Sequence, residues 1–406
     1  MTDWQWFKRG TANTWHRPVM KSGLVAMAVA GLVACGGSDD DTTAPVEPQP
    51  PVTPAVVGLM AGSESEAGYV DGPALQARFG YALSSLSYRP SGELLFVDNH
   101  AVRQLSKAGE VVTLAGDGQP GNVDGKGRSA RFNKPSSAVA APDGTVYVAD
   151  TENHLVRKLT PDGTVTTFAG QPGVCGNSDG PGVAATLCMP TNLALDAAGN
   201  LYVAEETVDP RPLAGSVTQR SSANPIRKIT PAGQVSTFAA KASEYPSNFA
   251  TIVGIVAYRP VSLAPNALGA VDAADPNDHV VRRYLPDGTS TVLSGVVTGV
   301  QGPTYPAATN AGWVDGSATE AKFGYEIQSL VRGTDGASYL LDQRSPGDNA
   351  LLIRRVKDDG SVSTVMTVPG CASHCKGAGL TRDASGAFVL ALVRSEPFSA
   401  GIYRYP

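Results

Sequence analysis

The sequence is short of charge, and the charge it has is weighted towards acids. Lys and Arg number 32 against 37 Asp and Glu, and charged residues make up 17% of the 406 residues. The formal net charge of -5 becomes about -8 if residues 1–34 are removed, because that segment carries four basic residues and one acidic residue. A surface of this sign repels phosphate backbones, so nucleic acid is not expected as a partner.

The N-terminal region lacks an apolar run long enough for a membrane span. Residues 23–34 form an uncharged run of 12 residues, whereas a helix needs roughly 20 to cross a bilayer. The run has the length of a signal-peptide apolar region, with Lys21 before it. Residues 32–36, Leu-Val-Ala-Cys-Gly, resemble the bacterial lipobox, in which the cysteine takes a diacylglycerol and becomes the new N-terminus. We expect a signal peptide over 1–34 and lipidation of Cys35; an ordinary signal peptide is the alternative, and Met20 is an alternative start.

The segment after Cys35 cannot form a core. Residues 36–56 begin Gly-Gly-Ser-Asp-Asp-Asp-Thr-Thr and then contain five prolines, a composition typical of an extended tether. The predicted organisation is a signal peptide over 1–34, a lipidated tether over 35–54 and one folded domain over 55–406. The expected location is outside the cytoplasm, anchored to a bacterial membrane by lipid alone. We expect the outer membrane, with the domain facing the periplasm or the surface.

Cysteine is scarce, and its spacing is informative. Of five cysteines, Cys35 is assigned to lipid. The other four fall into two local pairs, Cys175 with Cys188 and Cys371 with Cys375. An even remainder in an oxidising compartment predicts two disulfides. The alternative for residues 371–375 is a zinc site that includes His374, but structural zinc needs four ligands and no second Cys/His pair accompanies this one.

Internal repeats dominate the rest of the chain. A basic motif of alternating apolar and polar residues recurs, its leading arginines separated by 54, 70, 55 and 72 residues. Each copy is followed by a turn, often Asp-Gly, and another strand, and each is preceded by two strands. A four-stranded unit cannot bury both faces alone, so the copies must stack around an axis as an all-β propeller. The five copies are residues 102–105, 156–159, 226–229, 281–284 and 353–356.

The two ends of the chain complement each other. The last unit stops at Tyr405-Pro406, before any outer strand, while residues 55–61 match the outer strand at 110–116. We expect the N-terminal strand to complete the C-terminal blade. The ring would then close without an exposed seam. Five full units and this composite unit predict six four-stranded blades.

At these residues the sequence resembles the NHL-repeat family of propellers. The second unit matches best, with Val-Asp-Gly at 123–125, Ala-Arg-Phe at 130–132, Asn153-His154 and Val-Arg-Lys at 156–158. The fourth and last units are degenerate. The resemblance implies the propeller fold over about 350 residues, but members of the family serve as sensors, as protein- or RNA-binding platforms, and occasionally as lyases or hydrolases.

Two recurring sets of polar residues are candidates for chemistry. His100, His154 and His279 could converge on one opening and hold a metal; alternatively, each packs in its own turn, which their recurrence with the repeat favours. The recurring acids could ring a Ca²⁺ ion, or accept backbone N–H groups locally and pair with the motif arginines. No arrangement suggests a Ser/His/Asp nucleophile or a nucleotide site. The acids are Asp98, Asp150, Glu205, Asp272 and Asp342.

Inserts that break the repeat are the more informative candidates, because long loops on a rigid scaffold often bind ligands. They occupy 209–223, 296–312 and 344–349, and the strand order places all three on one face. We predict a non-enzymatic binding module for an envelope protein or a glycan, without a cofactor. The alternative is a lyase or lactone hydrolase with a divalent metal in the central channel. The expected binding face includes His100, His154, His279, Arg211, Arg220, Tyr305, Trp313 and Arg344.

Overall fold

The computed structural model describes most of residues 58–406, within the compact unit Thr53–Pro406. The described ranges are 58–206, 208–212, 218–220, 225–239, 262–276, 279–296, 312–324, 326–345, 348–369, 371, 375–395 and 398–406. Cys35, the predicted signal peptide and the predicted tether lie outside them. No helix among these residues is long and apolar enough to cross a bilayer.

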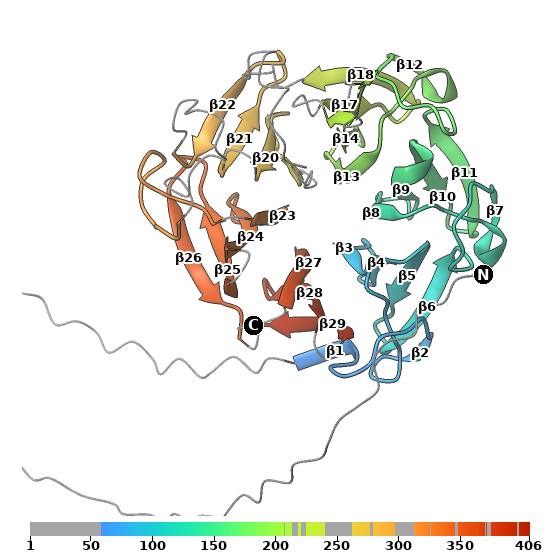
Figure 1. Cartoon of the computed structure of the whole chain (residues 1–406), viewed down its shortest axis with the longest axis horizontal. Coiled ribbons are helices and arrows are strands. Elements are labelled where there is room, and N and C mark those ends of the chain that lie inside the picture. The colour runs from blue at the N-terminus through green and yellow to red at the C-terminus, as the bar shows by residue number, and fades with distance from the viewer. Residues whose placement is uncertain are drawn as a thin grey trace, which may run out of the picture. The chain divides into compact units, whose positions relative to one another are not determined.

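Six antiparallel sheets are arranged as the blades of a propeller around a central axis, as the sequence predicts (Figure 1). From the axis outwards, blade 1 holds β3 (Ser84–Tyr88), β4 (Leu94–Asp98), β5 (Ala101–Leu105) and β6 (Glu110–Ala115). Blade 2 holds β8 (Pro135–Ala140), β9 (Val146–Asp150), β10 (Leu155–Leu159) and β11 (Thr164–Ala169). Blade 3 holds β13 (Pro190–Leu195), β14 (Leu201–Glu205), β17 (Ile226–Ile229) and β18 (Gln234–Ala239). Blade 4 holds β19 (Leu263–Pro265), β20 (Val271–Asp275), β21 (Val280–Tyr284) and β22 (Ser290–Ser294). Blade 5 holds β23 (Glu326–Arg332), β24 (Ser338–Ser345), β25 (Asp348–Val356) and β26 (Val362–Thr367). Blade 6 holds β27 (Cys375–Arg382), β28 (Phe388–Ser395), β29 (Phe398–Tyr405) and β1 (Gly58–Gly62).

The N-terminal strand closes the ring, which confirms the prediction from the chain ends. β1 is antiparallel to β29, with Gly58 opposite Arg404 and Gly62 opposite Gly401. Gly62 has a φ of +97°, and a Cβ there would lie 2.5 Å from the Ala400 carbonyl oxygen. Only glycine fits this close approach of two backbones. The last blade therefore depends on residues from both ends of the folded unit.

Blades 1 to 3 contain a fifth, two-residue strand that the sequence did not predict. These strands are β2 (Gly72–Pro73), β7 (Gly125–Lys126) and β12 (Gly180–Pro181), each paired with the outermost strand of its blade. Each belongs to the Asp-Gly loop that precedes the blade. Asp71 fixes the first loop, since its carboxylate accepts hydrogen bonds from Thr113 N (2.9 Å) and Thr113 Oγ1 (3.0 Å). The loop thereby covers the edge that the blade would otherwise leave open.

The first arginine of the basic motif is buried inside its blade between two acids. Arg103 donates to Asp98 at 2.6 Å and to Asp71 at 2.7 Å, and both Arg103 and Asp98 are fully buried. Burial raises the pKa of Asp98, and the Arg103 charge opposes that rise. These pairs confirm the structural interpretation of the motif. The same arrangement holds Arg157 with Asp150 and Asp124, Arg227 with Glu205 and Asp179, and Arg354 with Asp342 and Asp315.

In the fourth blade the acid equivalent to Asp98 is not Asp272, as the sequence analysis expected, but Asp275. Asp275, at the end of β20, is the equivalent of Asp98, because it lies opposite the first residue of the next strand and bonds to Arg282 at 3.0 Å. Asp272 lies within β20 and bonds to Arg283 instead. The loss of the Asp-Gly loop in this unit obscured the alignment, and the strand register resolves it.

The inner strands are joined to one another by a repeated hydrogen bond. In each case a backbone N–H of one inner strand donates to a polar side chain of the preceding blade. At the junction of blades 6 and 1 the equivalent position is glycine, and a Cβ on Gly379 would lie 3.1 Å from Leu86 N. The bonds are Ala138 N to Ser85 (3.0 Å), Leu193 N to Ser137 (3.1 Å), Leu263 N to Asn192 (3.0 Å) and Leu330 N to Ser262 (2.7 Å).

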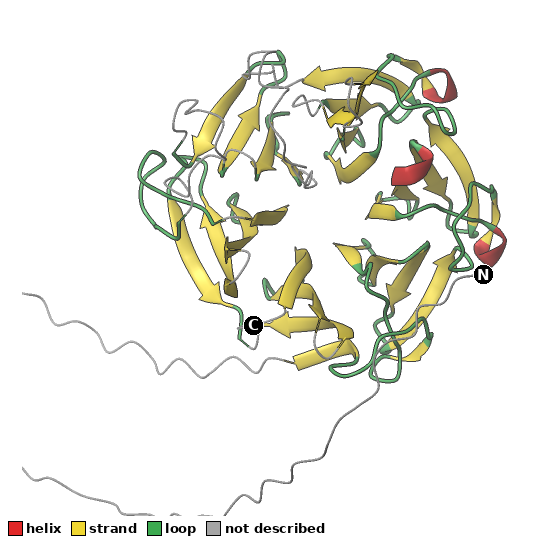
Figure 2. Ribbon diagram, in the orientation of Figure 1, coloured by secondary structure: helices red, strands yellow, loops and turns green. Residues whose placement is uncertain are grey.

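The two faces of the ring differ in their connections. We call the upper face the one that bears the turn between the second and third strands of each blade and the connection to the next blade; the lower face bears the other two turns. The described helices are single turns, η1 (Gly127–Ser129), η2 (Thr151–Asn153) and η3 (Gly182–Ala184) (Figure 2). The 209–223 insert lies between β14 and β17, and contains the hairpin of β15 (Val208–Pro212) and β16 (Thr218–Arg220). This insert and the other two lie in connections of the upper face.

Candidate binding face and inter-blade sites

The three predicted histidines lie at three different blade junctions. The Nδ1 atom of His100 accepts a hydrogen bond from Lys134 N, and that of His154 accepts one from Met189 N, both at 3.1 Å. His279 Nδ1 lies 2.8 Å from the Gly324 carbonyl oxygen. Each imidazole thus links a turn of one blade to the start of the next inner strand. The histidines do not converge on one opening, and their bonds cross to the next blade rather than staying within one turn.

The environment of His100 and His154 favours the neutral ring. Burial is the largest influence and lowers the pKa of each below its ordinary value. A neutral imidazole leaves Nδ1 free to accept the N–H of the next strand. His154 has a φ of 60°, in the left-handed region. These features indicate a structural role in joining blades.

The other predicted binding residues are less fully defined. Arg211 and Arg220 lie on the β15–β16 hairpin and Arg344 on β24, so they belong to the upper-face connections; only their backbone is described. Tyr305 lies outside the described residues. Trp313 is half-buried, and its side chain contributes to the environment of Asp342, whose pKa burial raises to about 7. Trp313 therefore belongs to the interior of blade 5.

The structure adds an exposed aromatic pair that the sequence analysis missed. Tyr81 precedes β3, Phe398 begins β29, and their ring centroids lie 5.4 Å apart at an interplanar angle of 79°. The exposed fractions are 62% for Tyr81 and 58% for Phe398. Both lie in upper-face connections, at the junction of blades 6 and 1. Their separation of more than 300 residues in the chain hid the pair.

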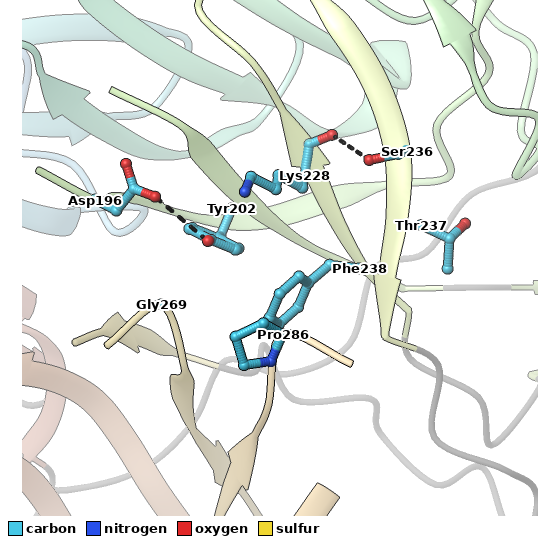
Figure 3. Close-up of a pocket in the computed structure, with 8 residues that line it drawn as sticks. All are labelled: Asp196, Tyr202, Lys228, Ser236, Thr237, Phe238, Gly269 and Pro286. Carbon is cyan, nitrogen blue, oxygen red and sulfur yellow. Dashed lines mark hydrogen bonds between the residues drawn. The ribbon is translucent and has the colours of Figure 1, made fainter. Parts of the chain in front are cut away.

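A pocket of about 300 Å³ lies between blades 3 and 4 on the lower face (Figure 3). Tyr202 stacks edge-on against Phe238 at 5.0 Å, lies 5.6 Å from Lys228 Nζ and donates to Asp196 at 3.3 Å. Burial and the Asp196 charge raise the pKa of Tyr202 to about 12. Gly269 and Pro286 of blade 4 also line the pocket.

The same side chains recur one junction earlier, which identifies the pocket as part of the repeat. Tyr147 pairs with Phe168 at 4.9 Å, lies opposite Lys158 in the sheet, and Gly199 lies against Pro231 as Gly269 lies against Pro286. A site for one particular ligand would break the repeat rather than follow it. This pocket is therefore a packing feature of two adjacent blades.

Between blades 4 and 5 the equivalent positions carry charges. Asp272 replaces the tyrosine, Arg283 the lysine and Asp358 the proline, and Arg332 joins them from β23. Each guanidinium donates to both carboxylates: Arg283 at 2.6 and 2.7 Å, Arg332 at 2.9 and 2.7 Å. These bonds raise the pKa of Arg283. Two acids and two arginines thus form a closed, neutral cluster.

Both predicted disulfides are present. Cys175 is bonded to Cys188, and Cys371 to Cys375. The first closes the loop that leads into blade 3, and the second lies at the start of β27. The zinc alternative at residues 371–375 is therefore wrong for the oxidised chain, because both cysteine sulfurs are already bonded to each other.

One blade of the propeller matches a known repeat. A model of the NHL repeat matches residues 132–159, which run from the Asp-Gly loop of blade 2 through β8, β9 and β10. This chain is a six-bladed propeller with an NHL repeat in blade 2. The matched residues include Arg157, which is buried within blade 2, and His154, which joins blade 2 to blade 3.

Curated relatives share the NHL repeat over short stretches. NHL repeat-containing protein 2 of Gallus gallus is 39% identical over 84 residues, 20% of this chain and 11% of that protein. Teneurin-m of Drosophila melanogaster is 29% identical over 209 residues, 47% of this chain and 7% of that protein. This propeller thus spans only a small part of the curated relatives it matches.

Solved structures share the fold over most of the propeller. A structural genomics protein of unknown function from Bacteroides thetaiotaomicron superposes with a TM-score of 0.58 at 18% identity, covering 86% of this chain and 76% of that one. An auxiliary nutrient binding protein from the same species gives a TM-score of 0.55 at 13% identity, with the same coverage. At these identities the likeness shows the fold alone.

Proposed function

We propose that this propeller is a non-enzymatic binding module that recognises an envelope protein or a glycan through its upper face. The observation that carries the proposal is the exposed Tyr81–Phe398 pair on the face where the inserts also emerge. Scattered apolar residues are normal on a surface, but two large aromatic rings in contact with each other are a recurrent binding feature. A partner that covers both rings would remove their apolar faces from water.

Polar groups lie on the same chain segments as the two rings. Arg394, on the same hairpin as Phe398, lies 3.5 Å from Glu64, and Tyr403 donates to Glu64 at 3.4 Å. Apolar rings beside a carboxylate and a guanidinium suit either a sugar or a polar protein surface. The binding class also agrees with the name of the auxiliary nutrient binding protein that shares the fold.

Recovery of envelope proteins and oligosaccharides on the immobilised domain tests the proposal. The test variants are Y81A/F398A and a chain shortened at 209–223, which removes Arg211 and Arg220. The matched control is L268A, because Leu268 is 87% exposed in a lower-face turn. We expect at least one partner to be lost from the first two variants and retained by L268A. Recovery of the same partners by all three would overturn the proposal.

A lyase or lactone hydrolase with a metal in the central channel is the competing function. Among the described residues, one group of three His, Cys, Asp or Glu side chains is close enough to hold a metal, namely His154, Cys175 and Cys188. That group lies at a blade junction and includes no inner-strand residue. We therefore favour the binder; one equivalent of tightly bound divalent metal in the oxidised domain would favour the enzyme.

We also propose that residues 1–34 are a signal peptide, that Cys35 carries lipid, and that residues 35–54 tether the domain to the outer membrane. The support is the short apolar run, the lipobox-like residues 32–36 and the proline-rich spacer. Growth with a labelled fatty acid should label the parent protein and not a C35S variant. Equal labelling of both would contradict lipidation at Cys35.

A further inference from the structure

The loop that enters blade 3 differs from its equivalents in how it is closed. In blade 2 the loop is closed by Arg131, which bonds to Asp117 at 2.8 Å; in blade 1, Arg78 bonds to Glu66 at the same distance. In blade 3 a threonine replaces the arginine, and the Cys175–Cys188 disulfide closes the loop. The backbone β-bridge that pairs Cys175 with Leu187 repeats the β-bridge that pairs Pro120 with Phe132 in the loop before blade 2. Cys175 thus stands in the place of Pro120, and Cys188 in that of Asn133.

His154 approaches this disulfide from the neighbouring blade. Its Nδ1 atom accepts the N–H of Met189, the residue after Cys188, at 3.1 Å. The ligand atoms of His154, Cys175 and Cys188 all lie within 4.8 Å of one another. His100 makes the equivalent bond to Lys134 but has no cysteine beside it. The chain therefore contains a matched pair of histidines, one with two sulfurs and one without.

We propose that reduction of the Cys175–Cys188 disulfide opens a site for a thiophilic divalent cation such as Zn²⁺, with Cys175, Cys188 and His154 as ligands. The inference does not depend on the proposed function. Thiolates and imidazole are the ligands that zinc prefers. A tetrahedral ion with bonds of about 2.0–2.3 Å places its ligand atoms roughly 3.5 Å apart, which small shifts of these three side chains achieve.

The chemistry balances with a dithiol or a phosphine as the reductant. A dithiol gives two electrons and two protons to the S–S bond and becomes a disulfide itself. A phosphine gives two electrons and becomes a phosphine oxide, and water supplies the oxygen and the two protons. Either reductant leaves two thiols at Cys175 and Cys188. The cation then displaces both thiol protons. Two thiolates, one neutral imidazole and M²⁺ give a site of zero net charge. Cys175 is exposed, so the attacking thiolate or phosphine reaches its sulfur and the Cys188 thiolate leaves.

When His154 binds the cation, its Nδ1 atom loses the hydrogen bond from Met189 N and gains a bond to the metal. A neutral imidazole carries one proton, and because Nδ1 already accepts the Met189 N–H, that proton is on Nε2. The lone pair on Nδ1 is therefore directed at the segment that contains Cys188, and the cation takes the place of the Met189 N–H. Cys175 lies on the solvent side, so the fourth coordination position is left to water, as in zinc sites with three protein ligands.

The test uses Co²⁺ as the probe and the full chain in a C371S/C375S background, which removes the other cysteine pair. After reduction with a water-soluble phosphine without oxygen, we expect one Co²⁺ per chain and a thiolate-to-cobalt charge-transfer band. H154N should weaken binding more than tenfold, because asparagine keeps an acceptor for Met189 N and tolerates the left-handed backbone but removes the nitrogen ligand. H100N is the matched control and should bind as its parent does. No band, or equal binding by H154N and H100N, would overturn the proposal.

A second measurement needs no cysteine variant. The unaltered chain is reduced, incubated with or without Zn²⁺, and treated with an alkylating reagent, and each cysteine-containing peptide is weighed. Zn²⁺ should slow alkylation of Cys175 and Cys188 at least tenfold, and the H154N change should abolish that protection. Circular dichroism of the reduced chain confirms that the blades remain folded. Equal alkylation with and without Zn²⁺ would exclude the site.

Discussion

Two neighbouring blade junctions perform the same packing task with opposite chemistry. Between blades 3 and 4, Tyr202 packs on Phe238, with Lys228 and Pro286 beside them; between blades 4 and 5, the equivalent positions hold the cluster of Asp272, Arg283, Arg332 and Asp358. The aromatic junction keeps its stability when one contact is weakened, because apolar contacts are many and non-directional. The charged cluster depends on every member, because an unpaired buried charge costs far more than a lost contact.

The largest expected effect comes from removing the buried acid of the charged junction. Asp272 has no exposed side-chain surface, and it accepts bonds from Arg283, Arg332 and Ser338. D272A leaves two guanidiniums to share the single carboxylate of Asp358, and we expect it to lower the free energy of unfolding by about 3–5 kcal/mol. Urea denaturation of the purified domain measures the loss. A change below about 1 kcal/mol would show that water already compensates these charges.

Converting the charged junction into an aromatic one should restore most of that stability. The variant D272Y/R283K/R332L/D358P introduces the Tyr, Lys and Pro of the junction between blades 3 and 4, and replaces Arg332 by leucine, the residue at the equivalent position Leu195 of blade 3. Replacing a buried charge cluster by well-packed apolar groups is often neutral or stabilising. We expect the free energy of unfolding of this variant to lie within about 2 kcal/mol of the parent's and above that of D272A. A graft less stable than D272A would mean that the two junctions differ in backbone as well as in side chains.

A smaller effect distinguishes the junction of blades 2 and 3, where His154 accepts the Met189 N–H. Burial lowers the pKa of His154 in the folded chain, so below pH 6.5 the unfolded chain binds more protons and stability falls as the pH falls. Protonation also removes the Nδ1 acceptor. From pH 7.5 to 5.5 the parent should lose roughly 0.5–1 kcal/mol more than H154N, the contribution of one hydrogen bond at a half-exposed site. Thermal unfolding across this range measures the difference, and parallel pH profiles would contradict it.

The smallest expected effect is at the lysine of the aromatic junction. Lys228 lies 5.6 Å from the Tyr202 ring, at the edge of the pocket. K228M keeps the aliphatic stem and removes the charge, so we expect a loss of about 0.5 kcal/mol or less, the size of an exposed cation–π contact. The matched change R283M should cost several times more, because it leaves Asp272 and Asp358 with a single guanidinium. Equal losses in the same denaturation assay would remove the distinction between the two junctions.

Features that are local and repeated could be predicted from the sequence. The basic motif, the turns that follow it and the matching chain ends predicted six blades and their closure by the N-terminal strand, and the two cysteine pairs predicted the disulfides. The prediction for Asp272 was wrong, because a degenerate repeat gives no local sign of which acid lies at the end of its strand. The Tyr81–Phe398 pair and the approach of His154 to Cys188 were not predicted, since both join residues of different blades.

The sequence by itself determined the blades, because apolar alternation and glycine-containing turns act over a few residues and recur six times. Only the tertiary structure decided what meets between blades: a histidine against the next inner strand, aromatics or charges at a junction, two rings on the upper face. Those contacts depend on the packing of one blade against the next, which no single repeat encodes.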